Sequence, residues 1–282
     1  MLKIGVIILN YLAYKTTIDT VNSFLNQNSN GCQIEYVIVD NFSSNDSFEV
    51  LKKEYKLHSN IHVVKTDSNL GFARGNNFGY NELIKIINPD FVIVSNDDIL
   101  LPKEGLYEWI EKAYKKYNFA VLGPDIYSIK GKYHQNPMNN FSTKRAKCKK
   151  ILKNFYRNYY SLKIRKLLGK KEINVYPSWK NNNYDVFTEN KTLHGSFQVF
   201  SRKYFEHFNE IYNSDTFLYM EERILKLRCD EKKIKMIYDP SYSVEHLQAV
   251  STNLINPDSM DKEIIRYKNL INSLKVYINL LN

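Results

Sequence analysis

The amino-acid sequence predicts an α/β protein in which a mostly parallel sheet is flanked by helices. Two observations lead to this prediction. Over the first 128 residues, short β-branched apolar runs alternate with stretches whose apolar residues recur at helical spacing. Polar or acidic residues follow each of the first four runs. Strands that alternate with helices form βαβ units, so their carboxyl ends meet at one edge of the sheet, where open α/β sheets bind ligands.

Each predicted strand is an apolar run rich in Val and Ile. The runs occupy residues 4–9, 36–39, 61–64, 91–94 and 120–122. The first helix is predicted between the first two runs, because Ile18, Val21 and Leu25 share one face of a helix.

Three further helices and a helical tail follow from local signals. Asp46 and Glu49 have the spacing of a capping box, which predicts a second helix at this point. Residues 76–87 and 103–117 supply the next two helices. The amphipathic tail from Ser259 is expected to pack on the body of the protein or on a partner chain.

The composition excludes several classes of protein. With 282 residues, 43% hydrophobic and 25% charged, the chain is neither collagenous nor intrinsically disordered. Its three cysteines are far apart and form no CxxC, which argues against a disulfide framework and for a reducing cytoplasm. No run approaches the ~20 apolar residues of a membrane span. We therefore expect a cytoplasmic protein.

The net charge of +10 comes from one segment. Residues 144–171 contain 12 Lys and Arg and no acidic residue, so the rest of the chain has 28 basic and 30 acidic residues. Three interpretations are open: a solvated helical hairpin, a nucleic-acid surface, or a surface for anionic membranes with cationic and aromatic groups at headgroup level. A sugar-stacking role for the nearby Trp179 is also open.

The four polar strand ends suggest a polar ligand at one sheet edge. They are Asn10-Tyr11, Asp40-Asn41, the segment 66–71 and Asn96-Asp97-Asp98. Turns favour such residues for structural reasons alone, but four ends on one edge favour a binding site. The sequence has no GxGxxG after the first strand and no GxxxxGK[ST], which argues against dinucleotide and P-loop sites.

The adjacent carboxylates of Asp97 and Asp98 point to a cation. Two acids after a buried strand repel each other and are costly to desolvate without a compensating charge. Oxygen ligands at a strand end suit Mg²⁺ or Mn²⁺ shared with a phosphate.

Several motifs together resemble the family 2 glycosyltransferases, and most closely their rhamnosyltransferase-like bacterial members. The first half contains VIILNY at 6–11, VIVDNFS at 37–43, NLGFARGNN at 69–77 and NDD at 96–98. The second half contains HGSF at 194–197, FLYMEE at 217–222 and VEH at 244–246. Each motif is weak alone, but their order and spacing match the family. The resemblance implies the GT-A fold, with a parallel-dominated mixed sheet flanked by helices.

The resemblance assigns roles residue by residue. The general base maps to Glu222, and the metal ligands map to Asp98, Asp97 and His246. Acceptor-binding residues map to His194, Gly195, Ser196 and Glu221. The donor-binding residues implied in this way are Asn10, Tyr11, Asp40, Asn41, Asn69, Gly71, Arg74, Asn76, Asn96 and Asp97.

The resemblance also implies a reaction. We expect an inverting glycosyltransferase that uses Mn²⁺ or Mg²⁺ and a UDP- or dTDP-linked sugar. The acceptor is expected to be a saccharide or a lipid-diphosphate-linked saccharide in cell-surface polysaccharide synthesis. Members of the family often use such acceptors at the inner membrane face, so the membrane interpretation of 144–171 is preferred. We therefore expect peripheral attachment to that face and no nucleic acid as partner. The expected organisation is a nucleotide-sugar half (1–128), a basic helical insertion (129–190) and an acceptor half with a C-terminal helix (191–282).

Other interpretations of these residues stay open. The chain departs from the family at Ile224, where the family often has an acid. This departure leaves open an altered donor or acceptor geometry and a weak or lost activity. Glu222 and Lys226 also have the spacing of a solvated i, i+4 ion pair. A lone His246 is more often a hydrogen-bonded residue than a ligand. The alternative functions are a basic nucleic-acid-binding protein, or a nucleotide-sugar binder without transfer activity.

Overall fold

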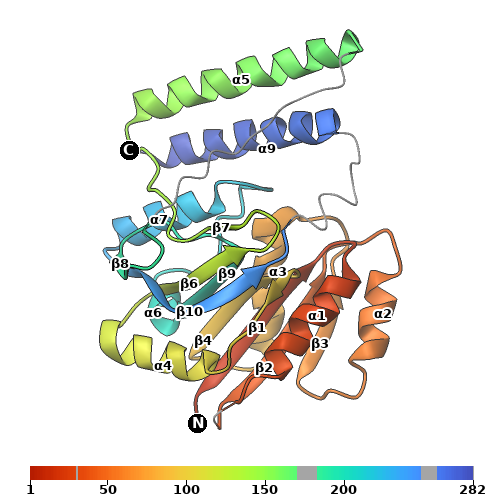
Figure 1. Ribbon diagram of the computed structural model, residues 1–282, viewed down its shortest axis with the longest axis vertical. Helices are drawn as coiled ribbons and strands as arrows, with labels where there is room; N and C mark the ends of the chain where they lie inside the picture. Colours follow the sequence, from red (N-terminus) through yellow and green to blue (C-terminus); the bar gives the residue numbers. More distant parts are fainter. Residues whose placement is uncertain (30, 170–182, 249–258, 282) are drawn as a thin grey trace.

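The computed structural model describes residues 1–29, 31–169, 183–248 and 259–281 (Figure 1). Within these residues, ten strands form one mixed sheet in the order β3-β2-β1-β4-β9-β6-β10-β5, with β7 beside β6 and β8 beside β10. The strands are β1 (Lys3–Asn10), β2 (Gln33–Asp40), β3 (Ile61–Lys65), β4 (Phe91–Asn96), β5 (Ile99–Leu100), β6 (Val121–Ser128), β7 (Tyr133–His134), β8 (Thr188–Glu189), β9 (Phe197–Ser201) and β10 (Met236–His246). The helices are α1 (Tyr14–Leu25), α2 (Ser47–Glu54), α3 (Gly71–Ile86), α4 (Leu106–Tyr117), α5 (Arg145–Leu167), α6 (Arg202–Phe205), α7 (Glu221–Glu231) and α9 (Ser259–Leu280).

The first half of the sheet is parallel, as predicted. The strands β3, β2, β1 and β4 are neighbours, and Asn10 pairs with Asp40 while Leu9 pairs with Asn96. Their carboxyl ends therefore lie level at one edge. The strand β9 runs antiparallel between β4 and β6, so its first residue reaches that same edge. The strands β6 and β10 are parallel and also end there.

Helices cover both faces of the sheet. Apolar residues of α1, α2 and α4 share one core with alternate residues of the strands, and residues of α3, α6 and α7 share the other. Two glycines bring α3 close to the sheet: a Cβ on Gly75 would lie 2.7 Å from Leu9, and one on Gly79 would lie 2.6 Å from Ile7. These glycines therefore serve helix packing.

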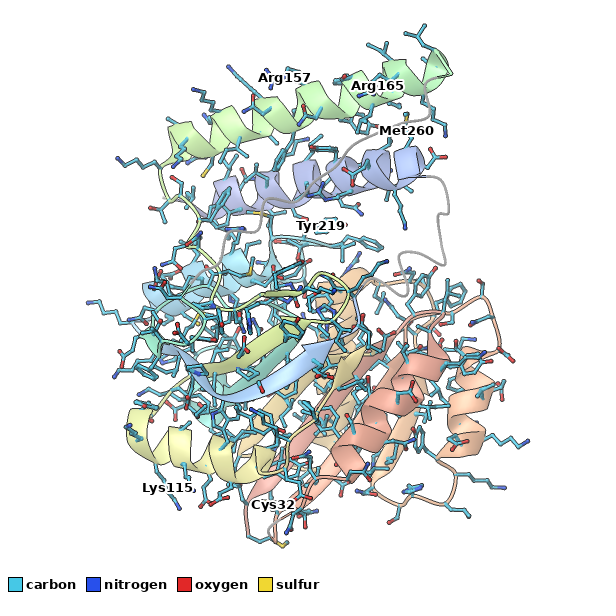
Figure 2. All side chains as sticks on the ribbon, in the orientation of Figure 1. Cys32, Lys115, Arg157, Arg165, Tyr219 and Met260 are labelled. Atoms are coloured by element: carbon cyan, nitrogen blue, oxygen red, sulfur yellow. The ribbon has the colours of Figure 1, made fainter. Side chains whose placement is uncertain are left out.

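The basic segment forms one long helix, α5, which packs against α9 (Figure 1). The helix α9 lies between α5 and the rest of the protein, and Tyr219 lies in the layer between α9 and the sheet (Figure 2). A third core joins the helix pair to α7 and contains Cys148, Ile224, Leu274 and Tyr277. The expected packing of the C-terminal tail on the body is confirmed. The predicted hairpin within the basic segment is corrected, because α9 supplies the second helix.

Two local predictions differ from the structure. The helix α3 begins at Gly71 rather than at residue 76, and it includes the first turn of the NLGFARGNN motif. The predicted capping box at Asp46 is wrong: α2 begins there, but Asp46 makes no side-chain cap hydrogen bond. Asn45 instead accepts from the Ser47 N–H and hydroxyl. Trp179 and the end of the basic segment, 170–171, lie outside the described residues. None of the described helices is long and apolar enough to cross a membrane.

Candidate active site

The predicted site residues gather along one edge of the sheet. This edge holds the ends of β1, β2, β4 and β10 and the start of β9, and the N-terminus of α7 approaches it. Segments from both halves of the chain therefore build the site. The hydrogen bond from the Asn96 N–H to the Ser196 carbonyl (2.9 Å) joins the two halves at this edge.

Asn10 and Asp40 form a buried network at the ends of β1 and β2. Asn10 donates to Asp40 Oδ2 (2.8 Å), and the Ser43 N–H donates to Asp40 Oδ1 (2.9 Å). Asn10 Oδ1 accepts from Thr17. Asp40 has no exposed surface, so its carboxylate fixes the strand ends from within. The exposed ring at this corner belongs to Phe42, for which the sequence motifs predict no role.

Asn41 and Asn69 hold the loop that leads into α3. Asn41 donates to Asn69 Oδ1 (3.2 Å) and to the Gly71 carbonyl (3.1 Å), and its own Oδ1 accepts from the Leu70 N–H. Gly71 has a φ of +74°, and a Cβ there would lie 2.2 Å from the Phe217 carbonyl. Only glycine combines this φ with this close approach. The loop is thereby fixed against the segment that precedes α7.

Three side chains in the first turns of α3 have different environments. Arg74 is exposed. Asn76 donates to the Phe72 carbonyl (2.9 Å), while its buried Oδ1 has no hydrogen-bond partner. Asn77, which received no role from the sequence, accepts from the N–H groups of Ile211 and Tyr212 and fixes a loop of the second half.

Asp97 and Asp98 form the turn between β4 and β5. Asp97 accepts from the Tyr11 N–H (3.3 Å), which links the ends of β1 and β4. Asp98 is buried, and its Oδ1 lies 3.1 Å from His246 Nε2 but has no hydrogen-bond partner. The structure thus brings together Asp98 and His246, two of the predicted metal ligands that lie 148 positions apart in the sequence.

Two residues beside this pair were missed by the sequence reasoning. Gln135 Oε1 lies 2.7 Å from His246 Nδ1, and Asn136 Oδ1 accepts from the His194 N–H (2.7 Å). No local motif marks either residue, because both act on partners that are distant in the sequence. Burial and the neighbouring His246 lower the pKa of His194 to about 3, so its imidazole is neutral at pH 7.

Glu222 faces the acceptor segment that begins β9. Its Oε1 accepts from the Gly195 N–H (3.3 Å), and a Cβ on Gly195 would lie 3.1 Å from that oxygen. Glycine therefore leaves room for the Glu222 side chain. The alternative of a Glu222–Lys226 ion pair is not what forms, because Lys226 pairs with Asp230.

Glu221, its neighbour, is buried beneath the loop before α7. Its Oε1 has no hydrogen-bond partner. Burial, and then the charge of Glu222, raise its pKa to about 8. Two adjacent glutamates thus differ: Glu221 keeps its proton at pH 7, and Glu222 is the more exposed of the two.

Asp98 and His246 fit a divalent cation that takes its other ligands from a diphosphate. Among the residues that the structure describes, no three His, Cys, Asp or Glu side chains form a complete metal-binding group. Octahedral Mg²⁺ holds ligands at about 2.0–2.1 Å, so adjacent ligand atoms lie about 3 Å apart. The 3.1 Å between Asp98 Oδ1 and His246 Nε2 matches this spacing, and the unpartnered Oδ1 is free to bind.

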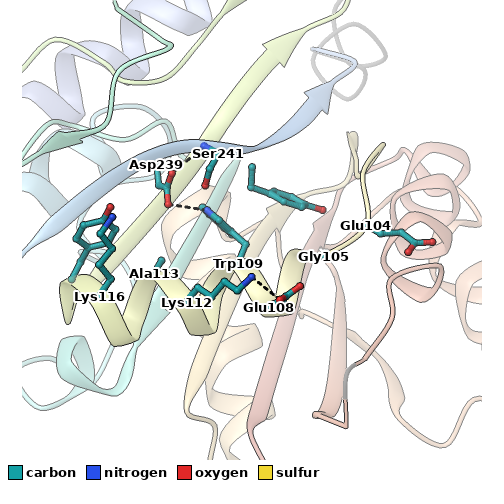
Figure 3. Close-up of a pocket in the computed structure, with 11 residues that line it drawn as sticks. Glu104, Gly105, Glu108, Trp109, Lys112, Ala113, Lys116, Asp239 and Ser241 are labelled. Atoms are coloured by element: carbon teal, nitrogen blue, oxygen red, sulfur yellow. Dashed lines mark hydrogen bonds and ion pairs between the residues drawn. The ribbon is translucent and has the colours of Figure 1, made fainter.

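A separate hollow of about 560 Å³ lies between α4 and the middle of β10, and none of the predicted site residues lines it (Figure 3). Trp109 donates to Asp239 (3.1 Å) and stacks on Tyr242 in its wall. Lys112 pairs with Glu108 at its rim. These four polar side chains are thus already partnered within the protein.

Comparisons with known proteins identify the family and the fold of the chain. The sequence matches the profile of Glycosyl transferase family 2 over residues 5–208. It is 26% identical over 188 residues to the low-salt glycan biosynthesis hexosyltransferase Agl10 of Haloferax volcanii. That match covers 67% of this chain and 50% of the relative, so the chain spans about half the length of that protein.

Solved glycosyltransferase structures share the fold. S. aureus TarS superposes with a TM-score of 0.56 at 13% identity, over 96% of this chain and 39% of that chain. GalNAc-T7 with UDP, GalNAc and Mn²⁺ superposes with a TM-score of 0.59 at 13% identity, over 87% of this chain and 44% of that chain. These likenesses show the GT-A fold, as predicted. Since the family profile matches well over half of the sequence, the chain belongs to glycosyl transferase family 2.

Proposed function

We propose that the protein is an inverting, metal-dependent glycosyltransferase. One observation carries the proposal: Glu222, aimed at the start of β9, shares an edge of the sheet with the Asp98–His246 pair and the donor-side strand ends. A general base and a diphosphate site must meet at such an edge for a sugar to pass from a nucleotide to a hydroxyl group. The Agl10 relative is named a hexosyltransferase, which supports hexosyl or deoxyhexosyl transfer.

Glu222 is proposed as the base. Its carboxylate takes the proton of an acceptor hydroxyl as that oxygen attacks the anomeric carbon from the face opposite the nucleotide. The Gly195 N–H holds one carboxylate oxygen and leaves the other for the acceptor. His194, Ser196 and the protonated Glu221 form the polar surroundings of the acceptor. Ile224 does not bear on this chemistry, because it lies in the core beneath α5 and α9.

The donor is proposed to lie along the ends of β1, β2 and β4. Tyr11 and Phe42 are proposed to contact the nucleobase of the donor. The residues that hold this surface in place from beneath are Asn10, Asp40, Asn41, Asn69 and Gly71. Arg74 and Asn96 are proposed to line the approach to the diphosphate, and the buried Asn76 and Asp97 to support it. Asp98 and His246, with Asp97 beside them, would hold Mn²⁺ or Mg²⁺. When bound, the cation offsets the charge that develops on the leaving diphosphate. The GalNAc-T7 structure contains UDP and Mn²⁺, which favours UDP over dTDP.

The acceptor is proposed to be a saccharide or lipid-linked saccharide in glycan assembly at the cytoplasmic face of the membrane. The Agl10 relative's name places that protein in glycan biosynthesis. The outward face of α5 is proposed as the membrane contact. Lys149, Lys150, Lys153 and Arg157 are exposed there, and Tyr160 and Ile164 follow them on the same face.

The test separates binding from transfer. The first measurement is the melting temperature of the wild-type protein, Glu222→Gln and Asp98→Asn with UDP, dTDP or GDP, each with and without Mn²⁺. The second is the rate at which the same proteins release nucleotide from the matching sugar donors. Loss of a general base lowers the rate by about 10²–10⁴-fold. Glu222→Gln should therefore lose transfer and keep the Mn²⁺-dependent rise in melting temperature, which Asp98→Asn should lose.

Two results would contradict the proposal. Transfer by Glu222→Gln at the wild-type rate would show that another group is the base. Mn²⁺-dependent nucleotide binding by the wild-type protein, without transfer to any tested acceptor or water, would favour a nucleotide-sugar binder instead.

A further inference from the structure

The two ring nitrogens of His246 face different partners. Nδ1 lies 2.7 Å from Gln135 Oε1, and Nε2 lies 3.1 Å from Asp98 Oδ1. Both neighbouring atoms are oxygens. All three side chains are buried, so water does not compete for these contacts.

The Gln135 contact determines where the imidazole proton lies. An amide oxygen only accepts hydrogen bonds, so the hydrogen atom between it and His246 must lie on Nδ1. A neutral imidazole carries one N–H, so Nε2 then holds a lone pair. That lone pair faces a carboxylate oxygen which has no hydrogen-bond partner.

A lone pair opposed to a carboxylate is unfavourable unless the ring takes up a second proton or a metal cation lies between the two groups. The same arrangement is what a divalent metal needs, because metal-bound histidines generally donate their other N–H to an oxygen that fixes the ring. In the opposite tautomer, Nε2–H would donate to Asp98 and satisfy it. With the Gln135 amide oxygen at Nδ1, a neutral His246 cannot make that hydrogen bond.

Gln135 is itself held rigidly. Its N–H donates to the Ile126 carbonyl of β6 (2.8 Å). Asn136, the next residue, donates to the Pro124 carbonyl (2.9 Å). The segment after β7 is thus tied to β6 on both sides of the Gln135 side chain. This fixes the amide oxygen relative to the end of β10, where His246 lies.

We propose that Gln135 is a positioning residue whose side-chain oxygen holds His246 in its Nδ1–H tautomer and turns Nε2 toward Asp98 as a cation ligand. The inference deepens the proposed function. It rests on that function for the identity of the molecule that binds together with the cation, a nucleoside diphosphate. The tautomer itself can be observed without metal, nucleotide or activity.

The first measurement is the tautomer. Nitrogen-15 NMR of the metal-free, full-length protein, at a pH about two units above the ordinary histidine pKa of ~6.5, reports which ring nitrogen carries the proton. The His246 signals are assigned by their loss in His246→Asn. The wild-type protein and Gln135→Glu should show Nδ1–H, because a carboxylate also accepts. Gln135→Met, which cannot accept in this way, should shift His246 toward the Nε2–H form.

The second measurement is the affinity for Mn²⁺ in the presence of saturating UDP, read from the electron paramagnetic resonance of free Mn²⁺. Loss of an outer-shell partner typically weakens metal binding about 10–100-fold. Gln135→Met should weaken Mn²⁺ binding by this factor, and Gln135→Glu should restore it to near the wild-type value. Gln33→Met, on β2 and away from the site, is the matched control and should change neither readout.

Failure of the inference can be told apart from failure of the proposed function. An Nε2–H tautomer in the wild-type protein, an unchanged tautomer in Gln135→Met, or no recovery of Mn²⁺ binding in Gln135→Glu would each overturn the role of Gln135. Absence of nucleotide binding in the wild-type protein would instead overturn the proposed function, and the tautomer readout would still apply. If Gln135→Met does not fold, the tautomer of the wild-type protein and the behaviour of Gln135→Glu decide.

Discussion

At the start of α7, two neighbouring glutamates occupy different environments. Glu222 is partly exposed and accepts from Gly195, while Glu221 is buried with one oxygen unpartnered. Burial and the charge of Glu222 raise the pKa of Glu221 from 4.5 to about 8. The charge of Glu222 makes ionisation of the buried Glu221 costly, because like charges that lie close together repel each other. The partly exposed Glu222 is therefore the better placed of the two for the proposed role of base.

This difference gives the folding stability a defined pH dependence. Between pH 4.5 and about 8, the unfolded chain releases the Glu221 proton while the folded protein keeps it. The free energy of unfolding therefore falls as the pH rises through this window and levels off above it. Glu221→Gln removes this loss. Its melting temperature should exceed that of the wild-type protein above pH 8 and match it below pH 4.5, as measured by calorimetry across the pH range.

A control variant isolates the cause. Because Glu222 is one source of the shift, Glu222→Gln should move the loss of stability to lower pH without removing it. A difference between Glu221→Gln and the wild-type protein that is the same at every pH would show that Glu221 does not titrate in this window.

Among the elements, α7 explains why this chain departs from its family. Ile224 has no exposed surface and packs with Cys148, Leu274 and Tyr277 of the outer helix pair. Glu222, the proposed base, lies on the side of α7 toward β9, while Ile224 packs with residues of α5 and α9. An apolar residue here follows from the packing of the outer helices.

Restoring the family acid should therefore damage the fold. Ile224→Asp places an unpaired charge in this core, at a cost of roughly 3–5 kcal/mol. At about 2–4 °C per kcal/mol, the melting temperature should fall clearly. Ile224→Val, which removes one methyl group, should cost about 0.5–1.5 kcal/mol. An Ile224→Asp protein with wild-type stability and higher activity would show that Ile224 belongs to the site.

The elements differ in how well their sequences predict them. The strands β1, β2 and β4 were predictable because they are largely buried and rich in β-branched residues, and β3, which is less buried, is also rich in Val and Ile. The start of α3 was missed because Gly71 normally ends a helix, whereas here its positive φ permits contact with Phe217. The capping box failed because Asn45 supplies the hydrogen bonds expected of Asp46. Competition between neighbouring residues for the same hydrogen bonds leaves no distinct pattern in the sequence.

At the scale of the whole molecule, the site is assembled from segments far apart in the chain. Motif spacing could predict that Asp98, Glu222 and His246 share one edge of the sheet, because all three lie at the ends of core strands or helices, while their catalytic and metal-binding roles stay predictions. Gln135 and Asn136 could not be predicted, because their roles depend on contacts to residues 111 and 58 positions away. They lie in the segment interpreted only as a basic insertion.

The charge of the molecule is as unevenly distributed as its sequence suggests. The helix α5 lies outermost, with α9 between it and the sheet (Figure 1). Its inward residues, including Cys148 and Phe155, pack toward α9 and α7. Its outward face carries the exposed Lys149, Lys150 and Lys153 and ends with Leu167, 87% exposed. An apolar end beside a basic stretch suits the headgroup region of an anionic membrane better than open water.

The location of these basic residues on α5 predicts an effect on vesicle binding that the net charge of the protein alone does not predict. Each Lys or Arg near an anionic membrane contributes about 1 kcal/mol. Changing Lys149, Lys150, Lys153 and Arg157 together to Gln should weaken binding to phosphatidylglycerol-containing vesicles by about 10²–10³-fold at ~0.1 M salt, as measured by co-sedimentation. The matched control changes four exposed lysines elsewhere to Gln and so removes the same charge: Lys53, Lys56, Lys112 and Lys115.

The comparison between these two variants decides what α5 does. If only the α5 variant loses vesicle binding, the outward face of this helix is the membrane contact, and the acceptor would be presented from the bilayer. Equal losses would mean that overall charge attracts the protein and that no particular face binds. If the wild-type protein instead ignores vesicles and binds oligonucleotides with a steep dependence on salt, the basic face of α5 serves nucleic acid.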